Sequence, residues 1–371
     1  MRFLFAGIWV VVGLGFLLSY ENSRHGAQQA ARVASNRTAA LNEPPPVTIA
    51  SIFAPHPISL AHLDRRKIRT LVATGDVIPA RSVNYKMEIY HDFLYPFRRT
   101  AGFLRRADTT LINLEAPLMN GCPITVQGMT FCGDPRFVQG LNYAGVDVAC
   151  TANNHIGNYA EAGIQETWMH LRAAHIQPCG LGLTAYRTIR GLRFAFLAYN
   201  CVGQRFDYAG ARQEIRDARK HAQIVVVSVH WGKEYVAVPQ VAPGIADDYP
   251  PKVAHWIIDS GADLIIGNHP HHIQGVEIYH GKLIAYAHGN FAFDQMFTVA
   301  DCPGDANFVC STREGVVGTY TFYGTRLISV RYRPVVIYDY AQPRWATPAQ
   351  ARIILNGMRQ ATQALARAGG H

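Results

Sequence analysis

Apolar runs in this sequence are repeatedly followed by side chains that can bind a metal ion. The run "TLVATG" leads into an aspartate, "TTLINL" into a glutamate and "VDVACTAN" into an asparagine. Further along, "IVVVSV" leads into one histidine and "ADLIIGN" into two. Each element alone is weak evidence, because a polar residue after a strand is usually a cap or turn residue. Their recurrence makes candidate metal ligands of Asp76, Glu115, Asn154, His230, His269 and His271.

The chemistry of this set is that of a mixed oxygen and nitrogen metal site. Two carboxylates, an amide oxygen and three imidazoles suit Mn, Zn or Fe. These ligands are enough for two ions that share a carboxylate. Two such ions about 3.5 to 4 Å apart polarise a phosphoryl or acyl oxygen and activate water near neutral pH. We therefore predict one or two divalent metal ions per chain as cofactors.

A reaction at such a site needs an acid that protonates the leaving group. His155 adjoins the candidate ligand Asn154, and imidazole titrates in the range that an acid needs. We predict that His155 is catalytic.

The segment "GNHPHHIQG" places three histidines around a proline. Pro270 biases the residue before it toward an extended conformation, and residues i and i+2 of an extended chain point to the same side. We therefore predict that His269 and His271 face the site together. His272 is expected to face away or to lie at the rim.

The elements that must position these groups follow from the alternation of apolar and amphipathic stretches. Apolar runs typical of buried strands lie at 70–74, 109–114, 146–152, 194–199, 224–229 and 262–267. Helix candidates lie between them, near 134–144, 160–175, 209–221 and 248–260. This alternation predicts an α/β fold, in which ligands bind beyond the carboxyl ends of the strands. After residue 273, short paired runs predict hairpins of a second sheet.

Residues 1–20 have the composition of a membrane segment, because Arg2 precedes about one bilayer thickness of apolar helix. No small-residue cleavage site follows at once, which favours an uncleaved anchor, with cleavage near Ala27 as the alternative. Positive charge stays on the cytoplasmic side. We therefore expect a single-pass anchor with the rest of the chain outside the cytoplasm, or a secreted protein if the segment is cleaved.

The remaining chain divides into a linker, a domain and a helix. Residues 21–66 are polar and Pro-rich, which predicts a flexible linker. The folded domain is predicted at 67–345. A C-terminal helix is predicted at 346–371, with Thr347 and Pro348 as its cap and first-turn residues.

The seven cysteines divide into two groups. Cys122 and Cys132 lie in one Gly-rich stretch, and Cys302 and Cys310 in another, so two local disulfides fit an oxidising compartment. The other three lie in or beside apolar runs and are interpreted as small buried hydrophobes: Cys150, Cys179 and Cys201.

Composition and motifs exclude several classes of function. The net charge of +9 is spread along the chain, which favours an anionic substrate or anionic lipid over nucleic acid. The sequence has no Gly-x-Ser-x-Gly elbow, Walker A loop or dinucleotide fingerprint. A serine nucleophile and dependence on ATP or NAD are therefore not indicated.

Five long motifs carry a resemblance to a known family: "ATGDVIPAR", "INLEAPL", "AGVDVACTANNHIGNY", "VSVHWGKEY" and "SGADLIIGNHPHHIQGVEIYHGKLIAYAHGNFAFD". In this order they resemble the CapA family of capsule (poly-γ-glutamate) synthesis proteins, which is similar to the calcineurin-like metallophosphoesterases. The resemblance covers roughly residues 68–295. It implies a four-layer α-β-β-α sandwich whose active site lies at the strand ends. It also implies a membrane-anchored, extracytoplasmic role in making or exporting an anionic cell-surface polymer.

The resemblance also implies roles for single residues. Asp76 matches the first aspartate of the metallophosphoesterases, and Glu115 stands roughly where that superfamily has its bridging aspartate. The Asn-His pair of that superfamily matches Asn154 and His155. Its isolated histidine matches His230, and its terminal His-x-His matches His269 and His271.

Three further positions are assigned to substrate binding: Arg81, Glu234 and Asn290. Arg81 and Glu234 match positions characteristic of the CapA family. A guanidinium suits a bidentate phosphate or carboxylate, and a surface salt bridge is the alternative for Arg81. Glu234 either holds a substrate amine or orients His230, and we favour the second role.

This chain departs from the family patterns at several positions. The metallophosphoesterase Asp-x-His is absent, because Val77 and Ile78 follow the aspartate, so the first ion has one ligand fewer. CapA sequences often continue Asn-Asn-His with Asp and Gly, whereas this chain has Asn158 and Ala160. His288 stands where Ser or Leu types are more usual.

Two classes of function remain open. The first is a metal-dependent hydrolase or transferase that acts in capsule or exopolymer production. The second is a noncatalytic, membrane-anchored assembly or export component that retains the fold. The expected partners are the membrane, an anionic polymer or phosphoester substrate, and other capsule synthesis or export proteins.

Overall fold

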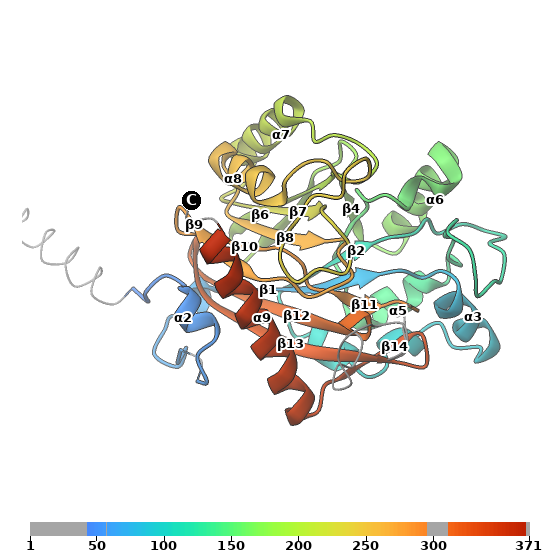
Figure 1. Cartoon of the computed structure of the whole chain (residues 1–371), viewed down its shortest axis with the longest axis horizontal. Helices are drawn as coiled ribbons and strands as arrows, with labels where there is room; N and C mark the ends of the chain where they lie inside the picture. Colours follow the sequence, from blue (N-terminus) through green and yellow to red (C-terminus); the bar gives the residue numbers. More distant parts are fainter. Residues whose placement is uncertain (1–42, 57, 295–310, 369–371) are drawn as a thin grey trace, which may run out of the picture. The chain divides into compact units, whose positions relative to one another are not determined.

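The computed structural model describes residues 43–56, 58–294 and 311–368. The described residues from Pro46 onward form one compact unit. Its described strands form two sheets with helices on their outer faces (Figure 1). The expected membrane segment, residues 1–20, lies outside the described residues, as do Cys302 and Cys310. None of the helices that the structure describes is long and apolar enough to cross a membrane.

The first sheet has eight strands. Its parallel part consists of β1 (Ile68–Val77), β2 (Thr109–Leu114), β3 (Val148–Cys150) and β4 (Gln177–Cys179). Beyond β1 it continues antiparallel through β12 (Glu314–Tyr323), β13 (Arg326–Tyr338) and β14 (Gln342–Trp345). The short strand β11 (Asn290–Ala292) pairs in parallel with the end of β1, so that Asp76 lies opposite Asn290.

The second sheet has six strands in the order β5-β6-β7-β8-β10-β9. The strands are β5 (Ala185–Ile189), β6 (Leu192–Asn200), β7 (Ile224–His230), β8 (Leu264–Asn268), β9 (Val276–Tyr279) and β10 (Lys282–Ala285). β6, β7, β8 and β10 run parallel, and β5 and β9 are antiparallel edge strands.

The helices cover the two outer faces. The first sheet is covered by α3 (Ser82–Ile89), α4 (Ala101–Leu104), α5 (Phe137–Ala144) and α6 (Ala160–Ala173). The second is covered by α7 (Tyr208–His221) and α8 (Pro250–Ser260), and α9 (Pro348–Ala368) packs along β13 and β9. The short helical segments are α2 (Ile49–Ile52), η1 (Arg65–Lys67), η2 (Tyr95–Phe97), η3 (Ile156–Tyr159) and η5 (Ser311–Arg313).

The alternation of side chains along β6 shows why these layers form. Phe194 and Phe196 point into the core between the two sheets, whereas Ala195 and Leu197 pack beneath α7 and α8. Successive side chains of a strand point to opposite faces, so a strand that is apolar throughout must be covered on both. The structure therefore has the α/β fold with two sheets between helices that the sequence predicts.

Two expectations about organisation were wrong. The hairpins after residue 273 do not share a second sheet, because β9 and β10 join β8 whereas β12 and β13 join β1. The domain also begins before residue 67. Val47 is 3% exposed and its backbone N–H donates to the Leu327 carbonyl at 3.2 Å, and Ile52 is 6% exposed. The carboxyl-terminal part of the predicted linker 21–66 thus packs on the domain, because its apolar side chains are buried there.

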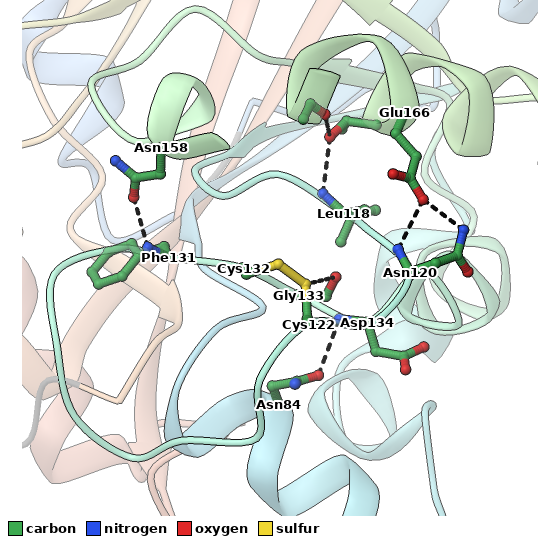
Figure 2. Close-up of a disulfide and its surroundings, with 12 residues drawn as sticks. Asn84, Leu118, Asn120, Cys122, Phe131, Cys132, Gly133, Asp134, Asn158 and Glu166 are labelled. Atoms are coloured by element: carbon green, nitrogen blue, oxygen red, sulfur yellow. Dashed lines mark hydrogen bonds between the residues drawn. A yellow bond between two sulfur atoms is a disulfide. The ribbon is translucent and has the colours of Figure 1, made fainter. Parts of the chain in front are cut away.

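The cysteine pattern of the described residues matches the prediction. Cys122 and Cys132 form a disulfide in the loop between β2 and α5 (Figure 2). Cys150, Cys179 and Cys201 are buried thiols in or beside strands.

Candidate metal centre

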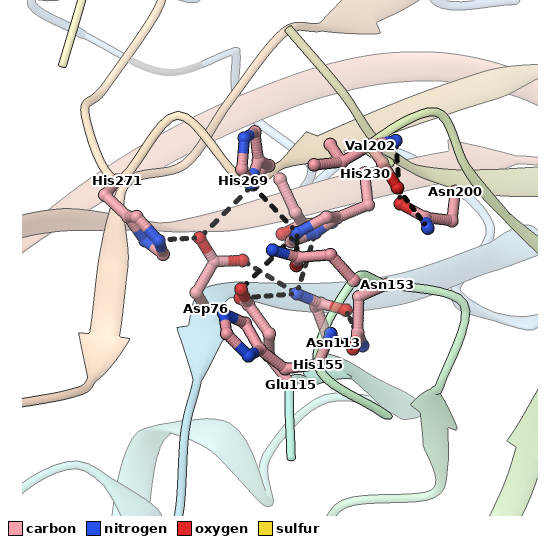
Figure 3. Close-up of polar contacts among 12 residues, drawn as sticks. Asp76, Asn113, Glu115, Asn153, His155, Asn200, Val202, His230, His269 and His271 are labelled. Atoms are coloured by element: carbon pink, nitrogen blue, oxygen red, sulfur yellow. Dashed lines mark hydrogen bonds and ion pairs between the residues drawn. The ribbon is translucent and has the colours of Figure 1, made fainter. Parts of the chain in front are cut away.

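The structure brings the six candidate ligands together at the carboxyl ends of the strands (Figure 3). The first sheet supplies the oxygen ligands: Asp76 in β1, Glu115 directly after β2 and Asn154 after β3. The second sheet supplies the imidazoles: His230 at the end of β7, and His269 and His271 after β8. Each sheet therefore contributes one kind of donor atom.

The distances show how closely the two sheets approach at this point. His230 Nε2 lies 2.9 Å from Asn154 Oδ1 and 3.4 Å from Glu115 Oε1. His269 Nδ1 lies 3.1 Å from His230 Nε2, and His271 Nδ1 lies 3.4 Å from Asp76 Oδ2. Two sets of three residues each have their ligand atoms within 4.8 Å of one another. One set is Asp76, Glu115 and His230, and the other is Glu115, His269 and His271. Glu115 belongs to both sets.

Two glycines permit this approach of backbone to backbone. A Cβ added at Gly75 would lie 2.0 Å from the Gly289 carbonyl oxygen, and one at Gly267 would lie 1.9 Å from the Tyr286 carbonyl oxygen. Real Cβ atoms do not come so close, so a larger residue would push β11 from β1 or β10 from β8. The glycine that precedes Asp76 and the one near the end of β8 thus hold the ligands in register.

The histidine segment after β8 does not have the extended conformation that we predicted. His269 has φ +94° and His271 has φ +50°, so both lie in backbone bends with left-handed φ values. Such angles are costly for residues with a side chain, and they persist where the surrounding structure imposes them. Both rings nevertheless face the cluster, and His272 instead directs Nδ1 to the Ile273 carbonyl at 2.8 Å.

Glu115 shows that the cluster fits a cation. Its side chain is fully buried, and its Oε1 atom accepts no hydrogen bond from the residues that the structure describes. Burial and repulsion from Asp76 raise the pKa of Glu115 well above its usual value. A buried carboxylate oxygen without a donor is costly unless a cation compensates it. The residues present therefore fit a divalent ion held by Glu115 and its neighbours.

Asp76 and His271 form a buried ion pair. Burial opposes the charge on Asp76, but the hydrogen bond and the charge of His271 outweigh it and lower the pKa of Asp76. Burial likewise opposes charge on His271, but the hydrogen bond with Asp76 and the charge of Glu115 raise its pKa to about 9. A proton on His271 thus balances the carboxylates in the absence of a metal ion.

The other two imidazoles are neutral at pH 7. Burial lowers the pKa of His230 to about 3. Burial and the neighbouring His230 and His271 hold the pKa of His269 well below its usual value. Neutral imidazoles are the form that binds a metal ion.

Asn113 is a member of the cluster that the sequence analysis missed. Its Nδ2 donates to Asp76 Oδ1 at 2.8 Å and to Glu115 Oε2 at 3.3 Å. Asn153 in turn donates to Asn113 Oδ1 at 3.2 Å and to the Leu114 carbonyl at 2.9 Å. Asn113 stands two residues before Glu115, and such residues share one face of a strand. That spacing was the signal that could have identified it.

Asn290 was wrongly assigned to the substrate. It is fully buried, and both ends of its amide are occupied: Oδ1 lies 2.9 Å from His271 Nδ1, and Nδ2 donates to the Thr312 carbonyl at 2.9 Å. Asn290 therefore orients His271.

Glu234 lies at the exposed edge of the cluster. Its Oε1 lies 3.9 Å from His269 Nε2, and its side chain is 40% exposed. The contact is with His269, whereas we expected His230.

Arg81 lies beside the cluster, between two aromatic rings. Its guanidinium carbon is 4.8 Å from the ring centroid of Phe131 and 5.2 Å from that of Phe293. It forms an ion pair with Asp294, and its Nε is buried and has no hydrogen-bond partner among the described residues. Arg81 is therefore partly committed to the fold and retains one N–H that an anion could accept.

Two other histidines lie close by. His155 is 8% exposed, and burial lowers its pKa to about 4, so the ring is neutral at pH 7. His288 is fully buried, with Nδ1 3.2 Å from the Thr74 carbonyl and Nε2 2.7 Å from the Tyr320 hydroxyl. Both nitrogens of His288 thus have partners away from the cluster.

Known proteins resemble this chain in sequence and in structure. The Bacillus anthracis capsule biosynthesis protein CapA is 27% identical over 265 residues, which cover 64% of this chain and 62% of that protein. The Bacillus subtilis PGA biosynthesis protein CapA is 31% identical over 170 residues, 40% of this chain and 43% of that protein. A probable polyglutamine synthesis accessory protein of Mycobacterium tuberculosis is 28% identical over 274 residues, 65% and 70% of the two chains. This chain spans less than two thirds of the length of the two Bacillus proteins.

Two solved structures show a weaker likeness. A hypothetical protein from Thermus thermophilus has a TM-score of 0.45 at 15% identity, covering 71% of this chain and 98% of that one. A putative 5'-nucleotidase from Staphylococcus aureus has a TM-score of 0.43 at 12% identity, covering 80% and 58%. The family model of the bacterial capsule synthesis protein PGA_cap matches residues 70–295, which are more than half of the chain and include every candidate ligand. The chain belongs to this family of bacterial capsule synthesis proteins.

Proposed function

We propose that this protein acts in the synthesis or export of an anionic cell-surface polymer of the poly-γ-glutamate type, through a metal-dependent hydrolase or transferase site. Family membership and the names of the relatives support the polymer role. The observation that carries the catalytic part is the convergence of oxygen and nitrogen donors around the buried, unsatisfied Glu115. The matches of these residues to metallophosphoesterase motifs support a fold of that type.

The ligands divide around Glu115, which is the carboxylate that two ions would share. The ligands would be Asp76, Glu115, Asn154, His230, His269 and His271. Such ions supply Lewis-acid polarisation of a phosphoryl or acyl oxygen and activation of water. The missing Asp-x-His histidine leaves one side of the site with fewer ligands. Ile78 occupies that position and is fully buried in an apolar cluster with Phe131 and Phe293.

Residues outside the metal cluster would bind and orient the substrate. The free Nε of Arg81 offers a hydrogen bond to a phosphate or carboxylate, and the net charge of +9 attracts an anionic polymer. His155 is neutral in the free protein, and an anion bound beside it would stabilise its protonated form and raise its pKa toward the range of a useful acid. On this basis we assign His155 to proton transfer with the leaving group.

The proposed location is outside the cytoplasm, with residues 1–20 as a membrane anchor. The apolar run that follows Arg2 supports the anchor. The Cys122–Cys132 disulfide supports an oxidising compartment. A fusion of alkaline phosphatase to the C-terminus tests this, because that enzyme is active only where its own disulfides form.

The test of function is deletion of the gene, followed by complementation. The wild type should restore a surface polymer, measured as acid-released glutamate and by capsule staining, and His271→Ala should not. Unchanged polymer after deletion would contradict the role. Full complementation by His271→Ala would instead favour the noncatalytic assembly component. Elemental analysis and assays for phosphodiesterase and γ-glutamyl hydrolase on the purified full chain identify the reaction.

A further inference from the structure

The disulfide-closed loop, residues 122–132, covers the proposed proton-transfer residue. The Phe131 ring stacks on the His155 ring with centroids 3.9 Å apart and planes inclined by 21°. Phe131 is 1% exposed, and the Arg81 guanidinium lies 4.8 Å from its centroid. The His155 ring is thus fixed on one face by a side chain that comes from a distant part of the sequence.

Asn158 connects this loop to His155 through one amide oxygen. Asn158 Oδ1 accepts the Phe131 backbone N–H at 2.6 Å (Figure 2). The same oxygen lies 3.0 Å from His155 Nδ1. A backbone N–H can only donate, so the oxygen of this amide faces both groups. In neutral His155 the proton must then lie on Nδ1, because an oxygen cannot donate to it. Nε2 is left as the nitrogen with a free lone pair.

The base of this loop is hydrogen-bonded to the domain, whereas its tip is exposed. At its base, Met119 N donates to the Gly133 carbonyl at 3.0 Å, and Leu118 N donates to Thr167 Oγ1 in α6 at 2.9 Å. The tip is exposed to solvent, with Ile124 58% and Met129 66% exposed. The disulfide therefore ties the residue next to Phe131 to the anchored base.

We propose that Phe131, Asn158 and the Cys122–Cys132 disulfide together position His155, so that Nε2 is the nitrogen that exchanges a proton with the substrate. This inference rests on the proposed hydrolase function. A positioned acid contributes about 10²- to 10⁴-fold to a rate when the leaving group needs a proton. The device should therefore matter for poor leaving groups and be nearly dispensable for good ones.

The kinetic test uses two substrates of one shape, phenyl phosphate and 4-nitrophenyl phosphate, with the full-length protein. Asn158→Ala should lower kcat for phenyl phosphate by about tenfold or more and leave KM unchanged. The loss for 4-nitrophenyl phosphate should be about threefold at most. Asn158→Asp keeps the acceptor and should restore most of the rate. Equal losses with both substrates, or no loss, would overturn the inference.

Two further variants probe the loop itself. Phe131→Leu and the double variant Cys122→Ser/Cys132→Ser should show the same dependence on the leaving group, with metal content unchanged. Ile124→Ala, at the exposed tip, is the matched control and should behave as the wild type. If the cysteine variant does not fold, Phe131→Leu still decides the question.

A second readout does not depend on activity. Nitrogen-15 NMR of histidine-labelled protein, with His155 identified by its loss in His155→Gln, should show the Nδ1–H tautomer in the wild type. Asn158→Ala should give a mixture of tautomers. An Nε2–H tautomer in the wild type would refute the positioning device even if no substrate is turned over. An inactive wild type with the expected tautomer would refute the hydrolase function alone.

Discussion

The two sheets contribute to the candidate metal centre in different ways. The first sheet supplies its two carboxylates from strands: Asp76 lies within β1, and Glu115 follows β2 directly, whereas Asn154 lies in a bend after β3. The second sheet supplies imidazoles partly from bends, since His269 and His271 have positive φ values. The two carboxylates thus depend on strand pairing, whereas two of the three histidines depend on a strained loop.

The electrostatic difference is as large as the geometric one. Burial, together with repulsion from Asp76, raises the pKa of Glu115. The pKa values of the histidines differ according to their neighbours. His271 meets Asp76 and has its pKa raised to about 9, whereas the pKa of His230 is lowered to about 3, chiefly by burial. Two equally buried imidazoles therefore have pKa shifts of opposite sign, because only one of them has a carboxylate partner whose effect outweighs that of burial. Glu115 is therefore the group at which a bound cation would compensate the most unfavourable charge.

The largest expected effect follows from the shared carboxylate. Glu115→Gln should weaken Mn²⁺ binding by about 100-fold or more, because both ligand groups lose a charged oxygen. The metal-free protein should be no less stable, since a buried carboxyl group with an unsatisfied oxygen is removed. Isothermal titration calorimetry and urea unfolding measure the two effects. Glu161→Gln, on the exposed surface of α6, is the control, and a parallel loss of stability and affinity would mean a structural role for Glu115.

The next effect concerns the second sheet and pH. A metal ion must displace the proton on His271, whose pKa is raised to about 9. Mn²⁺ affinity should therefore fall as pH falls below 9, by about tenfold per pH unit for one proton. Titrations at pH 7 and pH 9, in buffers with different ionisation enthalpies, count the protons released. His271→Gln should lose this part of the slope, and an unchanged slope would show that another group carries the proton.

A variant of Asn113 tests how far metal binding by the first sheet depends on residues that hydrogen-bond to the ligands. Asn113→Ala removes the donor shared by Asp76 and Glu115 and should lower metal affinity by about tenfold. Asn356→Ala, exposed on α9, is the matched control. Affinity unchanged in Asn113→Ala would show that strand pairing alone orients the two carboxylates.

The smallest effect concerns backbone strain on the first-sheet side. Ala160 begins α6 with φ +52° and ψ −155°, a conformation that glycine adopts at little cost. Ala160→Gly should stabilise the protein by about 1 kcal/mol, as measured by urea unfolding. Ala162→Gly, two residues further into α6, should destabilise it by about 1 kcal/mol. The same sign for both variants would show that the angle at Ala160 stores no strain.

Several features of the site followed from residue types and spacing. Each parallel strand that ends in a polar side chain was recognisable, because an apolar run stops at that residue, and all six candidate ligands came from this pattern. Asn113 was missed although its spacing from Glu115 was visible. Asn290 was misassigned, because sequence does not show that its amide is occupied by His271 and by the Thr312 carbonyl.

The sequence by itself indicated the strands that precede the ligands, the donor types at their ends and the disulfide-forming pair Cys122 and Cys132, since these depend on local pattern and short separation. The tertiary structure alone decided which strands share a sheet, where the domain begins and how the segment after β8 bends. Those features depend on contacts between distant segments, such as the close approach of Gly267 to Tyr286 and the packing of Phe131 on His155. A local stretch of sequence carries no signal for these features, because the free energy of such a contact arises only when both segments are in place.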